Sequence, residues 1–369
     1  MSDDFRFPRF FLHFLLVPLG TGPVFQTDGS MGYNRHDYNM KKIMLFLFTF
    51  VSVTMGFAQQ QVATLNHNDS ITPFYGAGAL QQAHAVAAPG DIITLSSGTF
   101  NAVNITKAVT IRGAGMFADT ASNTMATFVV GEFTINLPQD SMRLSIEGIR
   151  FSQQLYISLY NAYFSKCKFD GRFIGNSSNY CNNTTFVNCI FLKDLNNIKG
   201  SIFINSVISP FNTGLYDFRY NPNNTFNNCI VNAYMSFIND GNIYSNCIMR
   251  GQPNNPSSSC FNCLGSGVNS SGQVTGIFFS SPQNNNCKNI SSWESVFKTF
   301  TGTYYEGETF ELQDSIATKY LGTDGTQIGI YGGVMPFDPK VGNPKIRRCN
   351  VARRSTADGK LSVDIEVVP

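Results

Sequence analysis

Hydrophobic and polar positions repeat along the middle of the chain at intervals of roughly twenty residues. Each copy reads aromatic, variable, Asn, Cys or Ser, and then, with few exceptions, two apolar residues. The copies begin at Phe164, Phe186, Phe203, Phe226 and Tyr244, which lie 22, 17, 23 and 18 residues apart, and a weaker copy begins at Cys260. A constant motif at a variable interval predicts a coiled repeat whose turns are joined by loops of different lengths.

The motif indicates that each turn contributes short strands, which pair in parallel with the same strands of the next turn about 4.8 Å away. The aromatic residue and the Cys or Ser point inward, the residue after the Cys points outward, and Asn turns the corner. Asn suits the corner because it tolerates a left-handed backbone. The predicted ladder contains Asn188, Asn205, Asn228, Asn246 and Asn262, with Lys166 as the one departure. Stacked amides of this kind can hydrogen-bond from turn to turn.

Leucine-rich repeats are the alternative fold, because they also place Asn or Cys before an apolar residue. Leucine is scarce in these copies, the interval varies, and no helical pattern separates one copy from the next. The sequence therefore favours a parallel β-helix.

The ends of a coiled stack expose apolar core and need caps. The Ala-rich segment 77–87 predicts a short N-terminal capping helix. Near the other end, apolar and polar residues alternate over 361–367, which predicts a half-buried strand in a hairpin with 346–352. We therefore expect a β-helix domain at 59–343 and a C-terminal hairpin cap at 344–369.

The beginning of the chain predicts export. Two lysines precede an apolar run at 43–57, and small residues lead up to Gln59. This pattern is typical of a secretory signal peptide at 40–58, cleaved near Ala58, and the apolar run is short for a membrane span. The mature chain is expected to have no integral membrane span and to be secreted, periplasmic or on the cell surface. Residues 1–39 read as an extension from a start codon assigned too far upstream, and a genuine extension is the alternative.

Composition narrows the classes of function. Charged residues make up 14% of the 369 residues and the formal net charge is +2, which excludes nucleic-acid binding driven by bulk charge. Nine cysteines in an exported protein suggest disulfides, but Cys167, Cys189, Cys229 and Cys247 hold equivalent inward positions that suit small core side chains. Neighbouring turns lie within disulfide range, so Cys167–Cys189 and Cys229–Cys247 bonds stay open as alternatives to free thiols.

Several segments resemble right-handed parallel β-helix proteins of the pectin-lyase-like type. Residues 74–100 are similar to the opening of such proteins, with a Pro-Gly-Asp turn at 89–91 and a Gly-Thr-Phe strand end at 98–100. Residues 144–151 resemble a later turn, and 321–333 resemble the last coil of secreted bacterial members. The resemblance implies an all-β, right-handed parallel β-helix, and enzymes of this architecture cleave acidic polysaccharides.

The chemistry of such enzymes is sparsely represented. Lyases need carboxylates that hold Ca²⁺ and a Lys or Arg base, whereas hydrolases need carboxylates on both sides of the sugar bond. After the predicted cleavage site the only histidines are His67 and His84, and neither the polygalacturonase nor the lyase motif is present. The candidate catalytic residues are Asp170, Arg172, Lys193, Asp194, Asp217 and Arg219. Solvated salt pairs along the chain are the simpler explanation of these charges, pairing Asp170 with Arg172, Lys193 with Asp194 and Asp217 with Arg219.

No motif indicates a cofactor, and the C-x-x-C of Cys260 and Cys263 falls on the repeat, so no metal site is predicted. The favoured hypothesis is a non-catalytic, exported β-helix that binds glycans or surface partners, with contacts from Tyr156, Tyr160 and Tyr163. The alternative is a polysaccharide lyase or glycoside hydrolase acting on acidic polysaccharide. Three or more of the six charged candidates in one groove would favour the enzyme, and their dispersal would favour the binding protein.

Overall fold

The computed structural model describes most of the chain from residue 61 onward. The described residues are 61–120, 124–138, 143–176, 180–208, 221–232, 241–251, 259–268, 273, 275–279, 284–300, 304–342, 345–351, 359–360 and 363–368. The predicted extension at 1–39 and the predicted signal peptide at 40–58 lie outside them. For the last two strands the structure describes the backbone alone.

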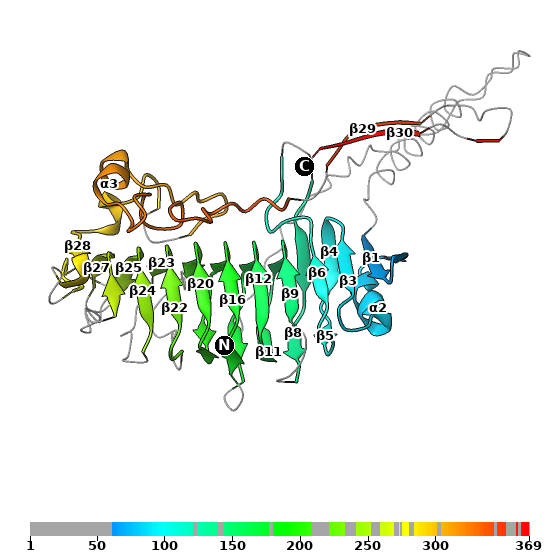
Figure 1. Cartoon of the computed structure of the whole chain (residues 1–369), viewed down its shortest axis with the longest axis horizontal. Coiled ribbons are helices and arrows are strands. Elements are labelled where there is room, and N and C mark those ends of the chain that lie inside the picture. The colour runs from blue at the N-terminus through cyan, green and yellow to red at the C-terminus, as the bar shows by residue number, and fades with distance from the viewer. Residues whose placement is uncertain are drawn as a thin grey trace, which may run out of the picture. The chain divides into compact units, whose positions relative to one another are not determined.

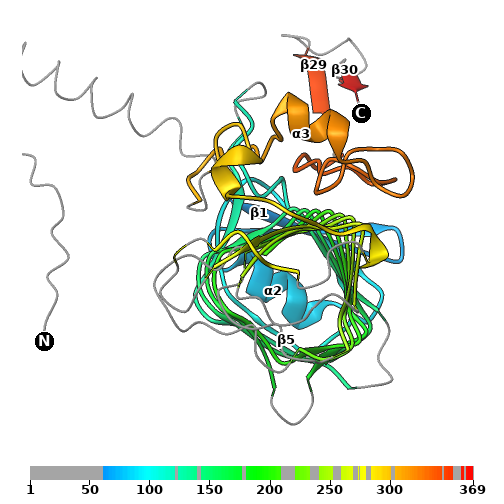
Figure 2. The same cartoon turned by 90° about the vertical axis from the view of Figure 1, so that its left-hand side faces the viewer.

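The described chain winds into a parallel β-solenoid of about eight turns, which confirms the predicted all-β parallel β-helix (Figures 1 and 2). The first sheet contains, in spatial order, β2 (Ser70–Tyr75), β1 (Val62–His67), β3 (Ile92–Leu95), β6 (Thr110–Arg112), β9 (Leu144–Glu147), β12 (Ala162–Ser165), β16 (Thr185–Val187), β20 (Ile202–Ile204), β22 (Thr225–Asn227), β24 (Ile243–Ser245) and β26 (Cys260–Phe261). The second contains β28 (Lys288–Asn289), β27 (Leu264–Gly267), β25 (Ile248–Gly251), β23 (Ile230–Asn232), β21 (Val207–Ile208), β17 (Ile190–Phe191), β13 (Lys168–Phe169), β10 (Arg150–Phe151), β7 (Thr127–Val130) and β4 (Gly98–Asn101). The third contains β18 (Leu195–Asn196), β14 (Phe173–Gly175), β11 (Leu155–Tyr160), β15 (Cys181–Asn182) and β19 (Ile198–Lys199), joined by β8 (Phe133–Asn136) and β5 (Asn104–Ile105).

A column of aromatic rings runs along the inside of the first sheet. Its members are Phe164, Phe186, Phe203, Phe226 and Tyr244, which are buried and share one register position. Successive ring centroids along the column are 5.3, 4.7, 4.6 and 4.7 Å apart, and the rings are stacked. An aromatic pair contributes about 0.5–1.5 kcal/mol beyond the burial of its area. The repeated aromatic residue therefore stabilises the stack and fixes its register.

The corner between the first and second sheets has a left-handed backbone. Asn188, Asn205, Asn228, Asn246 and Asn262 have φ angles between 46° and 54°. Lys166 holds the same place one turn before Asn188, with a φ of 52°. This conformation costs most L-residues roughly 1–2 kcal/mol, and Asn adopts it more readily than they do. The backbone requirement explains why Asn recurs at one position of the repeat.

The Cys or Ser after each corner residue connects neighbouring turns. The backbone N–H of Cys189 donates to Ser206 Oγ at 3.1 Å, and that of Cys229 donates to Cys247 Sγ at 3.4 Å. The backbone N–H of Cys247 in turn donates to Cys263 Sγ at 3.4 Å. The eight cysteines whose side chains are described are free thiols, and burial raises the pKa of Cys247 well above its usual value. A small acceptor is what this position requires, so Ser206 can stand where other turns have Cys.

The outer face of the second sheet is covered, which the sequence analysis did not anticipate. The outward residue after each Cys or Ser is apolar and buried at Ile190, Val207, Ile230, Ile248 and Leu264. The cover comes from residues 290–337, which include η3 (Trp293–Ser295) and α3 (Asp314–Lys319). Its buried members include Trp293, Phe297, Phe300, Phe310, Ile328 and Ile330. Figure 1 shows α3 and its neighbouring segments alongside the solenoid rather than within it.

The expectation that 321–333 forms the last coil is therefore wrong. This segment contains no strand, and its apolar residues pack on the outside of the second sheet instead of in the bore. It lies along the Asn corner, where side-chain amides donate to its backbone and to that of nearby Pro336 at 2.7–3.5 Å. The acceptors are the carbonyl oxygens of Leu321 for Asn262, Gly329 for Asn228, Ile330 and Gly332 for Asn205, and Pro336 for Asn188. Amide-to-amide bonds join Asn246, Asn262 and Asn286 of η2 (Asn284–Asn286).

Helix α2 (Ala79–Val86) lies across the bore, at the place predicted for the capping helix at 77–87 (Figure 2). Lys107 Nζ donates to the carbonyl oxygens of Ala85 at 2.8 Å and Ala87 at 2.7 Å, which satisfies the C-terminal end of the helix. Strands β1 and β2 form an antiparallel hairpin beside it, which was not predicted.

The predicted C-terminal hairpin is present as β29 (Lys345–Val351) and β30 (Val363–Val368), which pair antiparallel with an irregularity between Ile346 and Arg348. Its role as a cap stays a prediction. Within the described part of the chain, no helix has the length and apolar character needed to span a membrane.

Candidate functional site

A hollow opens at the corner between the second and third sheets, where the chain passes from β13 to β14 and from β17 to β18. Its volume is about 390 Å³, and we call it the corner groove. Its lining residues are Gln153, Gln154, Asp170, Gly171, Arg172, Lys193 and Asp194.

Three of the lining residues hold the same position on successive turns. Gln154, Arg172 and Asp194 each precede a strand of the third sheet. The backbone N–H groups of the residues that follow Gln154 and Arg172 donate to the carbonyl oxygens of Arg172 and Asp194, at 2.7 and 2.8 Å. The turns approach so closely that a Cβ at Gly171 would overlap the backbone of Gln153. A glycine is therefore required at this bend.

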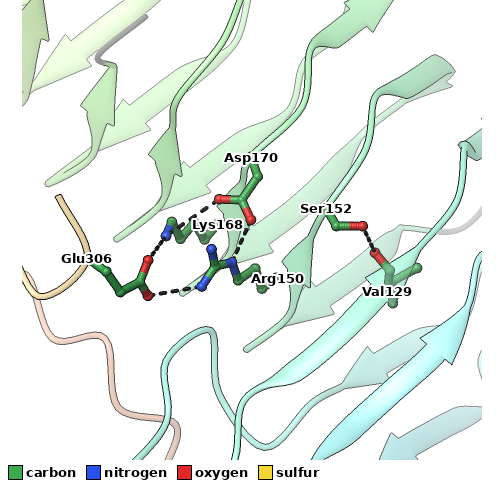
Figure 3. Close-up of polar contacts among 6 residues, drawn as sticks. All are labelled: Val129, Arg150, Ser152, Lys168, Asp170 and Glu306. Atoms are coloured by element: carbon green, nitrogen blue, oxygen red, sulfur yellow. Dashed lines mark hydrogen bonds and ion pairs between the residues drawn. The ribbon is translucent and has the colours of Figure 1, made fainter. Parts of the chain in front are cut away.

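Asp170 connects the corner groove to a cluster of ion pairs (Figure 3). Arg150 Nε donates to Asp170 Oδ2 at 2.5 Å, and Arg150 Nη1 donates to Glu306 Oε1 at 3.0 Å. Lys168 Nζ donates to Glu306 Oε2 at 2.7 Å and lies 3.5 Å from Asp170 Oδ1. Since Glu306 belongs to the cover, these bonds fasten the cover to the second sheet.

The cations of this cluster are desolvated and compensated. The Lys168 side chain is fully buried, and its ammonium group lies 4.7 Å from the ring centroid of Tyr304. Burial alone would lower the pKa of Arg150, but the hydrogen bond and charge of Asp170 and the charge of Glu306 raise it. Burial, with the Glu306 charge adding to it, raises the pKa of Tyr304. A buried cation is costly unless paired, so the carboxylates are needed to hold Lys168 in place.

Four of the six sequence candidates meet in the corner groove: Asp170, Arg172, Lys193 and Asp194. Asp217 and Arg219 lie outside the described residues. The pairing also differs from the one expected along the chain, because Arg172 Nε donates at 2.7 Å to Asp194 on the next turn. The Asp194 side chain is only 3% exposed, so the interpretation as a solvated salt pair is wrong for this residue. Winding brings residues of adjacent turns closer than their sequence separation suggests.

The corner groove presents hydrogen-bond donors to solvent. Lys193 and Gln153 are exposed, and the Arg172 side chain is 49% exposed. The carboxylates of Asp170 and Asp194 already accept hydrogen bonds from cations of the protein. This arrangement suits a ligand that carries negative charge and hydroxyl groups. Among the described residues, no group of three or more His, Cys, Asp or Glu side chains could hold a metal ion.

The outer face of the third sheet continues from the corner groove along β11, and we call the outward positions of β8, β11, β14, β15 and β19 the β11 face. A middle hollow of about 380 Å³ on this face is lined in part by Tyr156 and Ile174. A far hollow of about 730 Å³ is lined in part by Tyr160. Two of the three tyrosines expected to contact glycans thus lie on this face, whereas Tyr163 lies on the first sheet beneath the guanidinium of Arg143.

Sequence reasoning missed Arg150, Lys168 and Glu306. One signal was available, because Arg150 and Lys168 hold the register position that Ile190 occupies on the next turn. Charges in an otherwise apolar column indicate a buried partner. Glu306 is 138 residues from Lys168 and carries no local signal. No family model, curated protein or solved structure matches the chain.

Proposed function

We propose that the protein is an exported, non-catalytic β-helix that binds acidic glycans at the corner groove. The observation that carries this proposal is an excess of hydrogen-bond donors over free acceptors in the groove. The side chains of Arg172, Lys193 and Gln153 face solvent, whereas both carboxylates are engaged by protein cations. A uronate or sulfated sugar carries an acid group and hydroxyl groups that can accept hydrogen bonds from these donors. Export through the predicted signal peptide at 40–58 and a pectin-lyase-like relationship are parts of the same proposal.

Binding to an array of acidic and neutral polysaccharides tests the proposal, followed by titration of the best acidic binder. Lys193→Gln should weaken binding about tenfold, because a hydrogen bond to a charged group is worth about 1.5–3 kcal/mol. Lys340→Gln is the matched control, since it removes an exposed lysine that lies outside the groove, just beyond the cover. Absence of binding to any acidic glycan, or equal affinity of Lys193→Gln and wild type, contradicts the proposal.

A polysaccharide lyase is the second candidate. Asp170, Arg172, Lys193 and Asp194 meet in one groove, so the criterion of three or more gathered charges is fulfilled and favours an enzyme. Binding stays the first proposal because the carboxylates of both Asp170 and Asp194 are engaged by arginines of the protein. In β-elimination a base removes the proton from the carbon next to the uronate carboxylate, and a cation stabilises the negative charge that develops. A C=C bond then forms as the glycosidic C–O bond breaks, and the leaving oxygen takes up a proton from water. Of the groove residues, exposed Lys193 is the one placed to act as the base. Formation of unsaturated product by wild type, and its loss in Lys193→Gln with the fold intact, would establish the lyase and overturn the non-catalytic proposal.

A hydrolase is less well supported. It needs one carboxyl group that donates a proton to the leaving oxygen. Asp170 Oδ2 and Asp194 Oδ2 instead accept hydrogen bonds from Arg150 and Arg172. An assay for new reducing ends without unsaturated product separates this reaction from the lyase reaction.

A further inference from the structure

The far hollow lies at the end of β11 away from the corner groove. At about 730 Å³ it is nearly twice the volume of the corner groove. Its lining includes Tyr160, Tyr180, Asn182, Lys199, Asn136 and Ser158. It combines aromatic, amide, hydroxyl and ammonium groups, so it is neither a simple apolar gap nor a charged surface patch.

Three of these residues form a row across successive turns. Tyr160 pairs in register with Asn182 on β15, and Asn182 pairs with Lys199 on β19. Adjacent strands lie about 4.8 Å apart, so an aromatic ring, an amide and an ammonium group follow one another within the width of a sugar unit and its substituent. Parallel pairing at three consecutive turns fixes the order of these groups on a rigid sheet.

Lys199 gives the far hollow its charge. It is exposed, and none of the described residues that line the hollow is an Asp or Glu. At the corner groove, by contrast, Arg172 is paired with Asp194. The far hollow thus places an ammonium group beside a half-buried tyrosine and several neutral donors and acceptors. This combination favours a ligand with an acidic group, hydroxyls and a ring that has an apolar face.

We propose that the far hollow is a second sugar-binding site, which takes the acidic sugar unit of a chain whose other end occupies the corner groove. The acid group contacts Lys199, the sugar ring lies against Tyr160 and Tyr180, and the hydroxyls bond to the side chain of Asn182. The inference rests on the proposed function and adds to it a second site and a minimum length of the bound chain, which must reach from the corner groove to the far hollow.

The span between the two sites follows from the strand. Gln154 lines the corner groove and Tyr160 lines the far hollow. Six residues of β-strand cover about 20 Å, and the middle hollow at Tyr156 lies between them. A chain that reaches both sites gains affinity because its second contact becomes intramolecular. A chain too short to span them gains nothing from the second site.

Titration calorimetry with purified oligouronates of increasing length tests the inference. Neutral oligosaccharides of the same lengths control for charge. Wild type should show a steep rise in affinity at the length that first spans both sites. Lys199→Gln should remove that rise and lower the affinity for long chains about tenfold, while leaving the affinity for the shortest chains unchanged. Tyr160→Leu should lower the affinity for long chains in the same way.

Lys340→Gln serves again as the lysine control, and thermal unfolding of each variant verifies the fold. One outcome is that long oligouronates bind wild type with an affinity that Lys193→Gln lowers but that Lys199→Gln and Tyr160→Leu leave unchanged. That result refutes the second site, and the proposed function stands. If no oligouronate binds wild type, both fail together. A rise with length that Lys199→Gln leaves intact also refutes the inference.

Discussion

The second and third sheets belong to the same turns of one solenoid, yet their outer faces differ completely. Outward residues of the second sheet, such as Ile190 and Ile248, are buried beneath the cover. Outward residues of the third sheet, such as Tyr156 and Lys199, face solvent and line the middle and far hollows. Both sheets have the same parallel ladder and the same inward core. The outward positions alone therefore decide whether a face contributes to stability or is available to a ligand.

The boundary between the two faces lies at the turn from β13 to β14. Lys168 and Arg150 end the apolar column of the second sheet and bind Glu306 of the cover, while Asp170 reaches from the same cluster into the corner groove. The comparison teaches that a parallel solenoid can separate its structural and binding faces within a few residues.

The largest predicted effect comes from placing a charge on each face. Ile248→Asp would bury a carboxylate among the apolar side chains between the second sheet and the cover, and should destabilise the protein by about 4 kcal/mol or more. Tyr156→Asp, at a position 40% exposed on the β11 face, should cost less than about 1 kcal/mol. Denaturant unfolding of both variants measures the difference. Similar losses would contradict the comparison.

The next effect concerns the Asn corner, where the cover meets the solenoid. Asn205→Ala removes two hydrogen bonds to the cover and places Ala at a φ of 46°, so it should lose about 2–4 kcal/mol. Asn205→Gly removes the same bonds but accepts the backbone conformation, and should lose less. Unfolding midpoints compare the two. An Ala variant as stable as the Gly variant would show that the left-handed backbone is not the reason for Asn.

A smaller effect distinguishes the two partners of the ion pair between Lys168 and Glu306, which lies at the boundary between the two faces. Glu306→Gln leaves Lys168 buried with Asp170 as its remaining carboxylate at 3.5 Å, and should cost about 1–3 kcal/mol. Lys168→Met extends the apolar column and leaves Glu306, 55% exposed, still bonded to Arg150 and accessible to water, so it should cost less. Calorimetric unfolding tests the order. The reverse order would show that the attraction between Lys168 and its carboxylates outweighs the cost of burying its ammonium group.

The smallest effect is a pH dependence that involves neither face. Burial, and then the charge of Lys107, lower the pKa of His84, a residue of α2, from its ordinary 6.5. The folded state therefore binds fewer protons than the unfolded state below pH 6.5, so stability should fall as the pH drops from 6.5 towards the lower pKa of the folded protein. Melting temperature measured against pH, with His84→Gln as the control that removes the slope, tests this. An unchanged slope in the variant would assign it to other groups.

Asp91, at the same end of the solenoid as His84, should add to the loss of stability at lower pH. Burial acts to raise its pKa, but the hydrogen bonds from Ala88 N–H at 2.7 Å and from His67 at 2.8 Å, with the charges of His67 and Lys107, lower it below 3.8. Its contribution is present above pH 3.8 and is lost as the pH falls through the folded pKa. In Asp91→Asn this second decline in melting temperature should be absent.

The repeat predicted the solenoid because it reports local requirements. An inward aromatic such as Phe203, a left-handed corner such as Asn205 and a small acceptor such as Ser206 are each dictated by neighbouring turns. The cover could not be located in this way, because residues 290–337 have no repeat and their partners lie elsewhere in the sequence. The apolar outward residues, Ile230 and Ile248 among them, carried the missing signal of a covered face.

The site was predictable in part. The charged pairs near Arg172 and Lys193 marked the turn that forms the corner groove, since the register of a solenoid aligns equivalent residues. Their true partners were not predictable, because Asp194 reaches Arg172 across turns and Glu306 comes from the cover. The row of Tyr160, Asn182 and Lys199 was also missed, since loops of unequal length hide its common register.

The most direct test of the account is a lysine-acetylation footprint with and without a long oligouronate, read residue by residue by mass spectrometry. Lys193 in the corner groove and Lys199 on the β11 face should be protected together, while Lys340, just beyond the cover, and Lys288 at the end of the second sheet should react at their unliganded rates. Protection confined to Lys288 or Lys340, or equal labelling of all four lysines in saturating oligouronate, would contradict the assignment of the open third sheet as the binding face.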